Sequence, residues 1–193
     1  MAYIIGLTGG IGSGKTTLVN HMESLGVPVF IADEEAKKAM QSPHVLEEVK
    51  TSFGNSIFEN GQLNRQQLAS IVFSNPDKLK ELNSIIHPEV KRLFAIWLNQ
   101  HKTVPFVVYE AAILFESGSY QNCDYIITVT APLEDRITRV MQRDNCSREQ
   151  VLQRINAQWT DEERAAKSNF VIDNTTAQSA KNEIDKILKI LKN

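Results

Sequence analysis

A glycine-rich run near the N-terminus has the spacing of a phosphate-binding loop. Residues 9–16 read Gly-Gly-Ile-Gly-Ser-Gly-Lys-Thr, which matches the pattern G-x-x-x-x-G-K-[ST]. Glycines let such a loop curl so that successive backbone N–H groups point into one concavity. The helix that follows adds its unpaired N-terminal donors and the positive end of its dipole. The run therefore predicts a site for the phosphates of a nucleotide.

Two side chains of this loop have specific expected roles. Lys15 is expected to reach the β- and γ-phosphates of ATP from an exposed position, and the Thr16 hydroxyl is expected to ligate Mg²⁺. The residues expected to contact the nucleotide form one continuous run: Gly10, Ile11, Gly12, Ser13, Gly14, Lys15, Thr16 and Thr17.

Two acidic residues follow predicted strands, where a carboxylate can serve phosphoryl transfer. Asp33 comes just after the strand expected at residues 27–31, and Glu110 comes at the end of the strand expected at 106–109. Asp33 either caps the next helix or accepts the proton of an acceptor hydroxyl, and one carboxylate can do both. Glu110 is either a solvated strand end or the acid that binds Mg²⁺.

Arginines gather in the segment 134–154. Arg136, Arg139 and Arg143 are three and four residues apart, so they share one face of a predicted helix. Acidic residues are interspersed, which would suit a solvated face of ion pairs. Alternatively Arg139 and Arg143 stabilise the transferring phosphate from a lid, a task that suits the charged fork of arginine. Asn174, which follows the last predicted strand, either lies by the adenine or forms a plain turn.

The elements that must position these residues follow an α/β pattern. Short apolar runs alternate with amphipathic segments, which is typical of βαβ units around a parallel sheet. Helices are expected at 15–25 and at about 177–191. Five strands are expected, at residues 3–8, 27–31, 106–109, 125–129 and 170–172.

Two helical stretches interrupt this alternation. Insertions in such sheets fall at the carboxyl ends of strands, where ligands bind. The first stretch has no predicted strand and reads as helices at 34–41, 43–53, 65–73 and 76–100, with Pro88 expected to kink or break the last. The chain is thus predicted to be a single P-loop kinase domain, 1–193. Its predicted parts are a core at about 1–33, 102–131 and 168–193, a substrate-binding insertion at about 34–101, and a lid at about 132–167.

Composition narrows the class of protein. The 193 residues are 42% hydrophobic and 23% charged, which suits one globular domain with a sizeable core. The net charge of −2 gives no global field toward nucleic acid, and neither a signal peptide nor a membrane span is predicted. Cys123 and Cys146 form no CxxC motif, so we expect free thiols in a cytoplasmic protein. The expected partners are small molecules, with the chain a monomer or weak homo-oligomer.

Several segments together resemble the dephospho-CoA kinase family, within the group of P-loop kinases that includes the nucleoside monophosphate kinases. The resemblance runs over nearly the whole chain. It rests on the phosphate loop after Leu7-Thr8, on Gly61-Gln62-Leu63-Asn64-Arg65, on Ile86-His87-Pro88, on Ile113-Leu114-Phe115-Glu116, and on Arg139, Arg143 and Gln158. It implies a P-loop NTPase fold and use of ATP with Mg²⁺. It also implies transfer of the γ-phosphate to the ribose 3′-hydroxyl of dephospho-CoA, the last step of coenzyme A biosynthesis.

The resemblance also implies a set of acceptor contacts. The residues it places near dephospho-CoA are Thr8, Asp33, Arg65, His87 and Leu114. Without it, His87 could simply pack or cap, and Arg65 could be a solvated helix residue. This chain departs from the family pattern at two points. Ile31-Ala32-Asp33 replaces the usual Asp-Ala-Asp, and Glu110 and Ala112 stand where the family has aspartate and proline.

Other functions fit the phosphate loop taken alone. A regulatory NTPase switch is one, but the guanine-reading N-K-x-D signature is absent from the sequence. Another small-molecule kinase, or one acting on a nucleoside monophosphate, is the second. The order of segments from Gly61 to Pro88 argues against it by resemblance, and a panel of acceptor substrates separates these enzymes.

Overall fold

The computed structural model describes residues 2–192, which form two compact units. The first unit contains the described residues up to 31 and those from 101 onward. The second contains residues 32–100. The first unit is therefore discontinuous in sequence, and the helical stretch predicted from residue 34 makes up most of the second.

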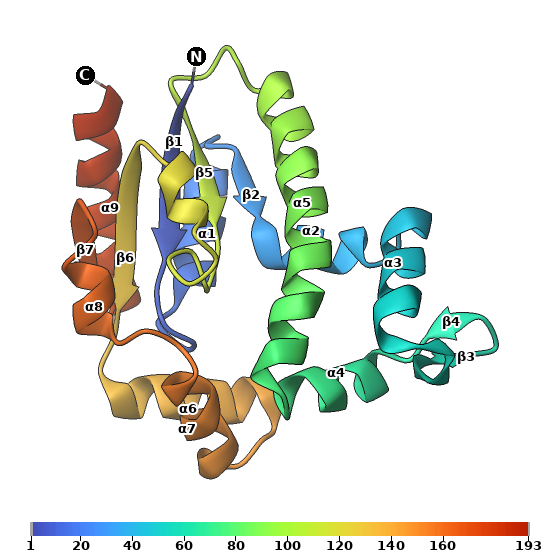
Figure 1. Cartoon of the computed structure of the whole chain (residues 1–193). Helices are drawn as coiled ribbons and strands as arrows, with labels where there is room; N and C mark the ends of the chain where they lie inside the picture. The colour runs from blue at the N-terminus through green and yellow to red at the C-terminus, as the bar shows by residue number, and fades with distance from the viewer. Residues whose placement is uncertain (1, 193) are drawn as a thin grey trace. The chain divides into compact units, whose positions relative to one another are not determined.

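The first unit is built on a five-stranded parallel sheet (Figure 1). The strands are β1 (Tyr3–Thr8), β2 (Val29–Ile31), β5 (Phe106–Glu110), β6 (Tyr125–Thr130) and β7 (Phe170–Asp173). Their order across the sheet is β2-β5-β1-β6-β7, and all paired strands are parallel. The predicted sheet is confirmed. Its second strand begins at Val29 instead of Val27, and β5, β6 and β7 each end one residue later than predicted. Pro28 precedes this strand; it lacks an N–H donor, although its carbonyl accepts from Val108.

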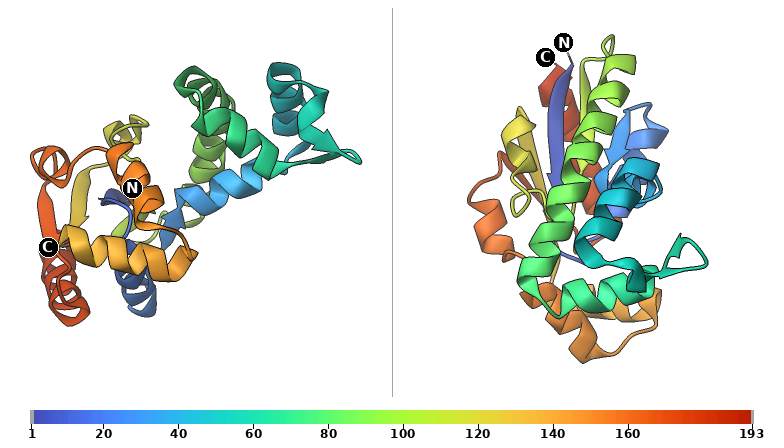
Figure 2. Two further views of the ribbon diagram at one scale, coloured as in Figure 1. Left: turned by 90° about the horizontal axis from the view of Figure 1, so that it is seen from below. Right: turned by 45° about the vertical axis from the view of Figure 1, so that its right-hand side comes forward.

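Helices α1 (Lys15–Ser24) and α9 (Ala177–Lys192) cover one face of this sheet. The view from below in Figure 2 shows them side by side. Leu18 and Met22 of α1 and Ile184 of α9 are fully buried in one apolar cluster with Ile5 and Leu7 of β1. Burying each such side chain stabilises the fold by about 1.5–3 kcal/mol. This packing fixes the direction in which α1 leaves the sheet, and with it the loop between β1 and α1.

The opposite face of β1 is in close contact with the segment that follows β5. A Cβ on Gly6 would lie 2.8 Å from Leu114 Cδ2 and 2.9 Å from Cys123 Sγ, so any larger residue there would have to displace one of these side chains. Burial raises the pKa of the Cys123 thiol to about 12. Cys123 and Cys146 are both free thiols, as predicted.

The remaining helices of this unit lie in the chain between β6 and β7. They are α6 (Leu133–Asp144), α7 (Arg148–Asn156) and the short α8 (Asp161–Ala165), with a 3₁₀ turn η2 (Ser119–Asn122) before β6. Figure 1 shows α6 and α7 beyond the carboxyl ends of β1 and β6. Since the loop after β1 begins at the same edge, the arginine-rich helix and the phosphate loop come together there.

The second unit is mainly helical. Its elements are α2 (Ala32–Ala39), α3 (Pro43–Phe53), η1 (Asn55–Ile57), β3 (Phe58–Glu59), β4 (Gln62–Leu63), α4 (Arg65–Phe73) and α5 (Pro76–Gln100). The long helix α5 packs against α2, α3 and α4. All four predicted helices are confirmed, and three of them have the predicted bounds. No helix within residues 2–192 combines the length and the apolar character that crossing a bilayer requires.

A small hairpin in this unit was not predicted. Strands β3 and β4 pair antiparallel through Phe58–Leu63 and Glu59–Gln62. The two residues between them, Asn60 and Gly61, have positive φ angles of 50° and 77°. These angles are typical of a type I′ turn, which Asn-Gly favours. The expectation of no strand here was wrong, and the Asn-Gly pair was the signal for one.

Helix α5 continues through Pro88. Of the two expected effects of this proline, a break is therefore wrong, and a kink stays a prediction. A proline removes the hydrogen bond to the carbonyl four residues earlier. Pro88 and Ser84 are both exposed, so water can satisfy the carbonyl of Ser84. Ile86 and Val90, on either side of the proline, are buried and hold the helix against its neighbours.

Candidate active site

The phosphate loop, residues 9–14, is tightly packed against the elements around it. Gly12 and Gly14 have φ angles of 80° and 91°, which other residues rarely adopt. A Cβ on Gly12 would lie 2.5 Å from the carbonyl oxygen of Arg136, and one on Gly14 would overlap the Asn174 amide nitrogen. Glycine is thus required at both positions by conformation and by space. The loop leads into α1, whose first N–H groups lack intrahelical acceptors and favour an anion.

The ammonium group of Lys15 is folded back onto this loop. Its Nζ donates to the Gly9 carbonyl at 2.9 Å and lies 3.8 Å from Glu110 Oε1. Only 11% of its side chain is exposed, so the expectation of an exposed Lys15 was wrong. Sequence spacing identifies the lysine but not the distant carboxylate that draws it in. The result is a cation already fixed beside the loop N–H groups.

Glu110 and Thr16 are the oxygen donors predicted to hold Mg²⁺. Glu110 is the last residue of β5, where it pairs in register with Leu7 of β1 and Ile31 of β2. Its side chain is 10% exposed. Thr16 lies exposed in the first turn of α1. No group of three His, Cys, Asp or Glu side chains within residues 2–192 could hold a metal. That agrees with Mg²⁺, which takes one or two protein oxygens and completes its shell with water and phosphate.

Three arginines of α6 occupy different environments. Arg139 contacts the loop: Nη1 lies 3.4 Å from the Gly12 carbonyl oxygen, and Nη2 donates to the Asn174 carbonyl at 3.1 Å. Arg136 is buried against the loop, with Nε donating to the Ile11 carbonyl at 3.0 Å. Arg143 is exposed, so the shared helix face does not give the three a shared function.

Arg143 is held by its neighbour in sequence. Its Nε and Nη2 donate to the two carboxylate oxygens of Asp144 at 2.7 and 2.9 Å. Arg154 donates to the same carboxylate at 2.6 Å. The hydrogen bonds from Arg143 and then Arg154 hold the pKa of Asp144 well below its usual range. Two of the three guanidinium nitrogens of Arg143 are thus bonded to this carboxylate.

Asn174 lies against the phosphate loop as a buried residue. Its side-chain amide donates to the Ser13 carbonyl at 2.7 Å, and its own N–H donates to Thr130 at 2.8 Å. Its Oδ1 is buried with no protein hydrogen-bond partner. A buried acceptor left without a donor costs free energy, so this oxygen is available to a donor on a ligand.

Thr8 and Leu114, expected near the acceptor, are both fully buried. The Thr8 hydroxyl has no protein hydrogen-bond partner. Leu114 packs against Gly6 of β1. Its side chain is therefore part of the core in this structure, and it supports the sheet under the loop.

Asp33 belongs to the second unit, at the second position of α2. The helix begins directly after β2, so Asp33 lies in its first turn and not at the N-cap position. It is exposed, with Glu34 and Glu35 beside it in the same turn. A carboxylate in the first turn interacts favourably with the helix dipole, but this one has no structural partner that would explain it.

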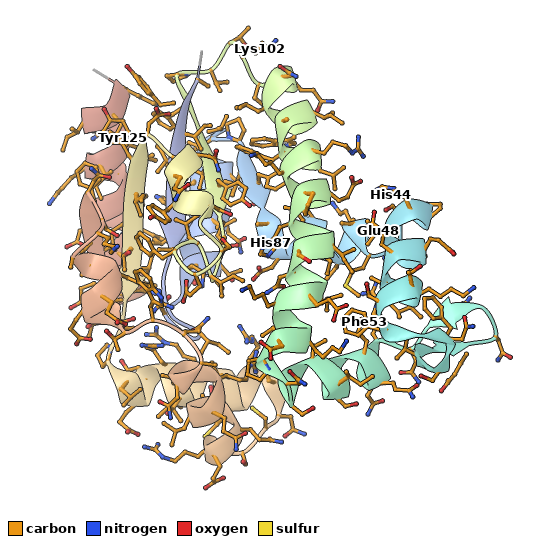
Figure 3. All side chains as sticks on the ribbon, in the orientation of Figure 1. His44, Glu48, Phe53, His87, Lys102 and Tyr125 are labelled. Atoms are coloured by element: carbon orange, nitrogen blue, oxygen red, sulfur yellow. The ribbon has the colours of Figure 1, made fainter. Side chains whose placement is uncertain are left out.

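Arg65 and His87 also belong to the second unit. Arg65 begins α4, is exposed, and donates to the Lys37 carbonyl at 3.2 Å. His87 lies on α5 (Figure 3) and is partly buried. Burial lowers the pKa of His87, so its imidazole is neutral at pH 7. It can therefore accept or donate a hydrogen bond, but it does not supply a positive charge.

Two residues near the loop were missed by sequence reasoning. Asp161 accepts from Arg136 Nη1 at 2.9 Å. Arg164 is fully buried and donates to Glu116 at 3.1 Å and to the Trp159 carbonyl. Neither residue belongs to a sequence motif. Each has a partner more than twenty positions away, which local spacing in the sequence does not reveal. A single charged residue in the acidic helix α8 does not show, from the sequence alone, which distant side chain it will meet.

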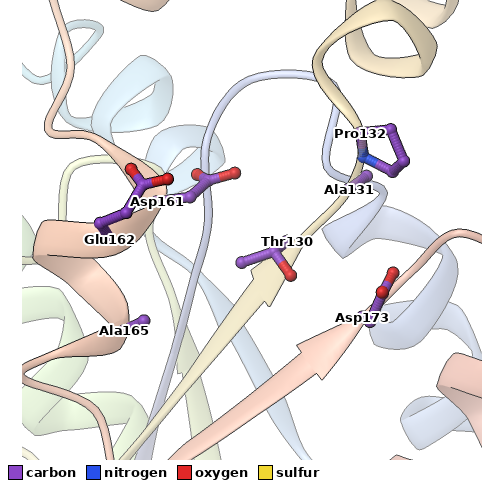
Figure 4. Close-up of a pocket in the computed structure, with 7 residues that line it drawn as sticks. All are labelled: Thr130, Ala131, Pro132, Asp161, Glu162, Ala165 and Asp173. Atoms are coloured by element: carbon purple, nitrogen blue, oxygen red, sulfur yellow. The ribbon is translucent and has the colours of Figure 1, made fainter.

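A hollow of about 350 Å³ lies at the carboxyl ends of β6 and β7 (Figure 4). Asp161, Glu162 and Asp173 contribute carboxylates to its wall, together with Thr130, Ala131, Pro132 and Ala165. Asp161 is paired with Arg136, and the lining residues include no Lys or Arg that faces the hollow. A triphosphate would therefore meet the carboxylates of Glu162 and Asp173 without a cationic partner in this wall. The phosphate-binding chemistry of this unit belongs to the loop between β1 and α1.

Comparisons with known proteins agree with this geometry. Residues 3–179 match the dephospho-CoA kinase family. A dephospho-CoA kinase of Bacteroides fragilis is 43% identical over 175 residues, which cover 90% of this chain and 85% of the relative. A Thermus thermophilus crystal structure is similar with a TM-score of 0.90 and 38% identity, over 98% of this chain and 97% of that one.

A dephospho-CoA kinase structure from Campylobacter jejuni is similar with a TM-score of 0.69 and 29% identity, over 98% of each chain. The match extends through the phosphate loop, the helical second unit and the arginine-rich helix. The α/β fold with a parallel sheet and a P-loop, predicted from the sequence, is thereby confirmed. The chain belongs to the dephospho-CoA kinase family.

Proposed function

We propose that this enzyme transfers the γ-phosphate of ATP to the ribose 3′-hydroxyl of dephospho-CoA, giving CoA and ADP. The observation that carries the proposal is the family match over residues 3–179, joined to a preformed phosphate loop with Lys15 fixed beside it. In the reaction, a bond forms between the 3′-oxygen and the γ-phosphorus. The bond from that phosphorus to the β–γ bridging oxygen breaks, and ADP leaves.

The nucleotide phosphates bind backbone N–H groups within residues 10–17 in this proposal. The N–H groups of Ile11, Ser13 and Thr17 are not among them, because they donate to Gln158 Oε1 and to the carbonyls of Gly10 and Gly14. Lys15 neutralises charge on the β- and γ-phosphates, and moves from the Gly9 carbonyl and Glu110 to do so. Thr16 and Glu110 would hold Mg²⁺, which would supply further neutralisation of the phosphate charge. Asn174 Oδ1 would accept a hydrogen bond from the adenine amino group, because it is buried without a protein donor.

Phosphoryl transfer depends mainly on position and on charge stabilisation. Arg139 contacts the loop from α6 and is assigned to the charge on the transferring phosphate. Arg143 is assigned the same role, after it exchanges Asp144 for a phosphate. The Asp144 carboxylate and a phosphate group each offer the pair of oxygens that a guanidinium prefers.

The acceptor is assigned to the second unit and to Thr8. Asp33 accepts the proton of the 3′-hydroxyl as it attacks, which fits an exposed carboxylate without a structural partner. Arg65 and neutral His87 bind polar groups of dephospho-CoA, and Leu114 contributes by holding the sheet behind Thr8. Binding energy from the pantetheine arm, away from the reacting atoms, then helps to orient the hydroxyl.

The test is an ADP-release assay with dephospho-CoA, with AMP, and with no acceptor. ADP release that depends on dephospho-CoA, with CoA as the product by mass, supports the proposal. Equal release with AMP, or without any acceptor, contradicts it. We further propose that the enzyme works in the cytoplasm. We also propose that it is a monomer or weak homo-oligomer, and light scattering measures this oligomeric state. Its two free thiols suit a reducing compartment.

A further inference from the structure

We propose that Arg136, Gln158 and Asp161 form a clasp that holds the phosphate loop in its nucleotide-binding shape. In this view Arg136 positions the loop and does not contact phosphate, although it lies on the same helix as Arg139 and Arg143. The inference rests on the proposed nucleotide site and adds positioning residues to it.

Arg136 is the first part of the loop clasp. It is 6% exposed, and its Nε donates to the Ile11 carbonyl at 3.0 Å. Its Nη2 lies so close to Gly10 that a Cβ there would overlap it, and its backbone leaves no space for one on Gly12. Three consecutive loop residues, 10–12, are thus in contact with this one arginine.

Gln158 is the second part, and it holds the same loop residue from the segment between α7 and α8. Its Oε1 accepts from the Ile11 N–H at 2.9 Å. Both backbone polar groups of Ile11 are therefore bonded to side chains that lie more than 120 residues away in sequence. This arrangement fixes the peptide planes on both sides of Ile11.

Asp161 is the third part, and it fixes the guanidinium that makes the first contact. Its Oδ2 accepts from Arg136 Nη1 at 2.9 Å, and its Oδ1 lies 3.5 Å from Arg164 Nη1. Arg164 is fully buried and is held in turn by Glu116 at 3.1 Å. Trp159, next to Gln158, stacks on Phe115 with ring centroids 5.3 Å apart. The clasp thus stands on packed and hydrogen-bonded structure.

A different role for Arg136, direct contact with the transferring phosphate, fits these contacts poorly. To reach a phosphate it would have to leave both the Ile11 carbonyl and Asp161. Those two acceptors are only partly exposed, so losing an ionic donor there is costly. Arg139 and Arg143 have no comparable burial, with 37% and 59% of their side chains exposed.

The functional consequence is pre-organisation. A loop that samples several shapes binds its ligand more weakly, in proportion to the fraction of time spent in the competent one. The phosphates contact the loop in the ground state and in the transition state alike. Loosening it should therefore raise the ATP KM and the ADP Kd much more than it lowers kcat.

Arg136→Met is the first test, measured by ADP calorimetry and by steady-state kinetics. We expect the ADP Kd and the ATP KM to rise about tenfold or more, with kcat within about threefold of wild type. Arg136→Lys should not restore affinity, because one ammonium cannot replace the two donors of the fork. A larger loss in kcat than in affinity, restored by lysine, overturns the proposal, since it marks a phosphate contact.

Gln158→Met is the second test, because Gln158 is partly exposed and its replacement leaves no charge without a partner. We expect a higher ADP Kd, and less than additive losses when it is combined with Arg136→Met, since both side chains hold Ile11. Gln153→Met and Arg148→Met, at exposed sites on α7, are the matched controls and should bind ADP like wild type. Wild-type ADP affinity in Gln158→Met overturns the clasp. Failure of the wild-type protein to bind ADP would instead contradict the proposed nucleotide site.

Discussion

At the scale of single residues, charged side chains around the phosphate loop are already held by protein groups. Lys15 is bonded to the Gly9 carbonyl, and Arg143 is bonded to Asp144. Each has an oxygen partner of the kind that a phosphate can replace. In the proposed reaction each side chain exchanges a protein oxygen for a phosphate oxygen, so neither charge is left without a partner when the triphosphate binds.

Lys15→Met tests the role of the positive charge on the Lys15 ammonium group. Methionine keeps the length of the side chain but removes its charge. We expect kcat/KM for ATP to fall about 10²–10³-fold, the range found when a preorganised donor to a developing charge is removed. Steady-state kinetics measure the effect. Lys189→Met, at an exposed position on α9, is the control and should retain wild-type activity.

Asp33→Asn separates a chemical role for this residue from a structural one. Asparagine cannot accept the proton of the attacking hydroxyl, so we expect kcat to fall at least roughly 10²-fold. Loss of one charge in the first turn of α2 should cost no more than about 0.3–1 kcal/mol of stability. Glu34→Gln is the control, because it removes a neighbouring exposed charge from the same turn. It should change the free energy of unfolding by as much as Asp33→Asn does, but should keep the wild-type kcat.

An Asp33→Asn enzyme with kcat within a few-fold of wild type would exclude the role of base. Thermal unfolding of both variants shows whether a loss of rate is only a loss of folded protein.

The sequence could predict the residues of the site wherever a motif fixes their spacing. Glycines and Lys15 of the loop could be assigned because a phosphate cradle needs them at set intervals. The pairs that complete the site could not be predicted, since Lys15 meets Glu110 and Ile11 meets Gln158 across 95 and 147 positions. Only the fold brings such partners together.

At the scale of elements, α5 shows how a helix can carry a buried charge. Glu89 is 6% exposed and accepts from Arg92 Nε and Nη2 at 2.7 and 2.8 Å, while His44 Nε2 of α3 lies 3.3 Å away. The hydrogen bonds from Arg92 are the main cause of the lowered pKa of Glu89. This carboxylate therefore ties α5 to α3.

That lowered pKa gives a pH dependence with a definite sign. The unfolded chain protonates Glu89 near its ordinary pKa of 4.5, while the folded protein keeps it ionised at lower pH. Its contribution to stability is present above pH 4.5 and is lost as the pH falls through the lowered folded-state pKa.

We therefore expect Glu89→Gln to lower the free energy of unfolding by about 1 kcal/mol at neutral pH, with a shrinking difference from wild type below pH 4.5. Urea titrations at several pH values measure it. Glu48→Gln, at an exposed position of α3 (Figure 3), should show no such pH-dependent difference.

The elements themselves were largely predictable. Strand β1 and helices α3, α4 and α5 have the predicted bounds because apolar periodicity and terminal residues such as Pro43 and Pro76 mark them. Whether Pro88 interrupts α5 could not be decided from the sequence, since packing at Ile86 and Val90 overrides the local cost of a proline.

At the scale of the whole molecule, a ligand that binds only the folded protein must stabilise it. ADP at 100 times its Kd should stabilise the first unit by about 2.7 kcal/mol. For a chain of this size, that corresponds to a rise in Tm of roughly 5–10 °C. Differential scanning fluorimetry with ADP, and with adenosine as the control without phosphates, measures it. An equal shift with adenosine would contradict binding through the phosphate loop.

The strand order has a consequence for synthesis on the ribosome. Strand β1 lies between β5 and β6, so residues 3–8 have no neighbour in the sheet until Phe106 has been made. At typical translation rates that delay is roughly 5–20 s. The helical second unit is continuous and is completed in the interval, so it can fold first. The apolar run Ile4-Ile5-Gly6-Leu7 meanwhile lacks its sheet partners, which leaves apolar surface exposed on the nascent chain.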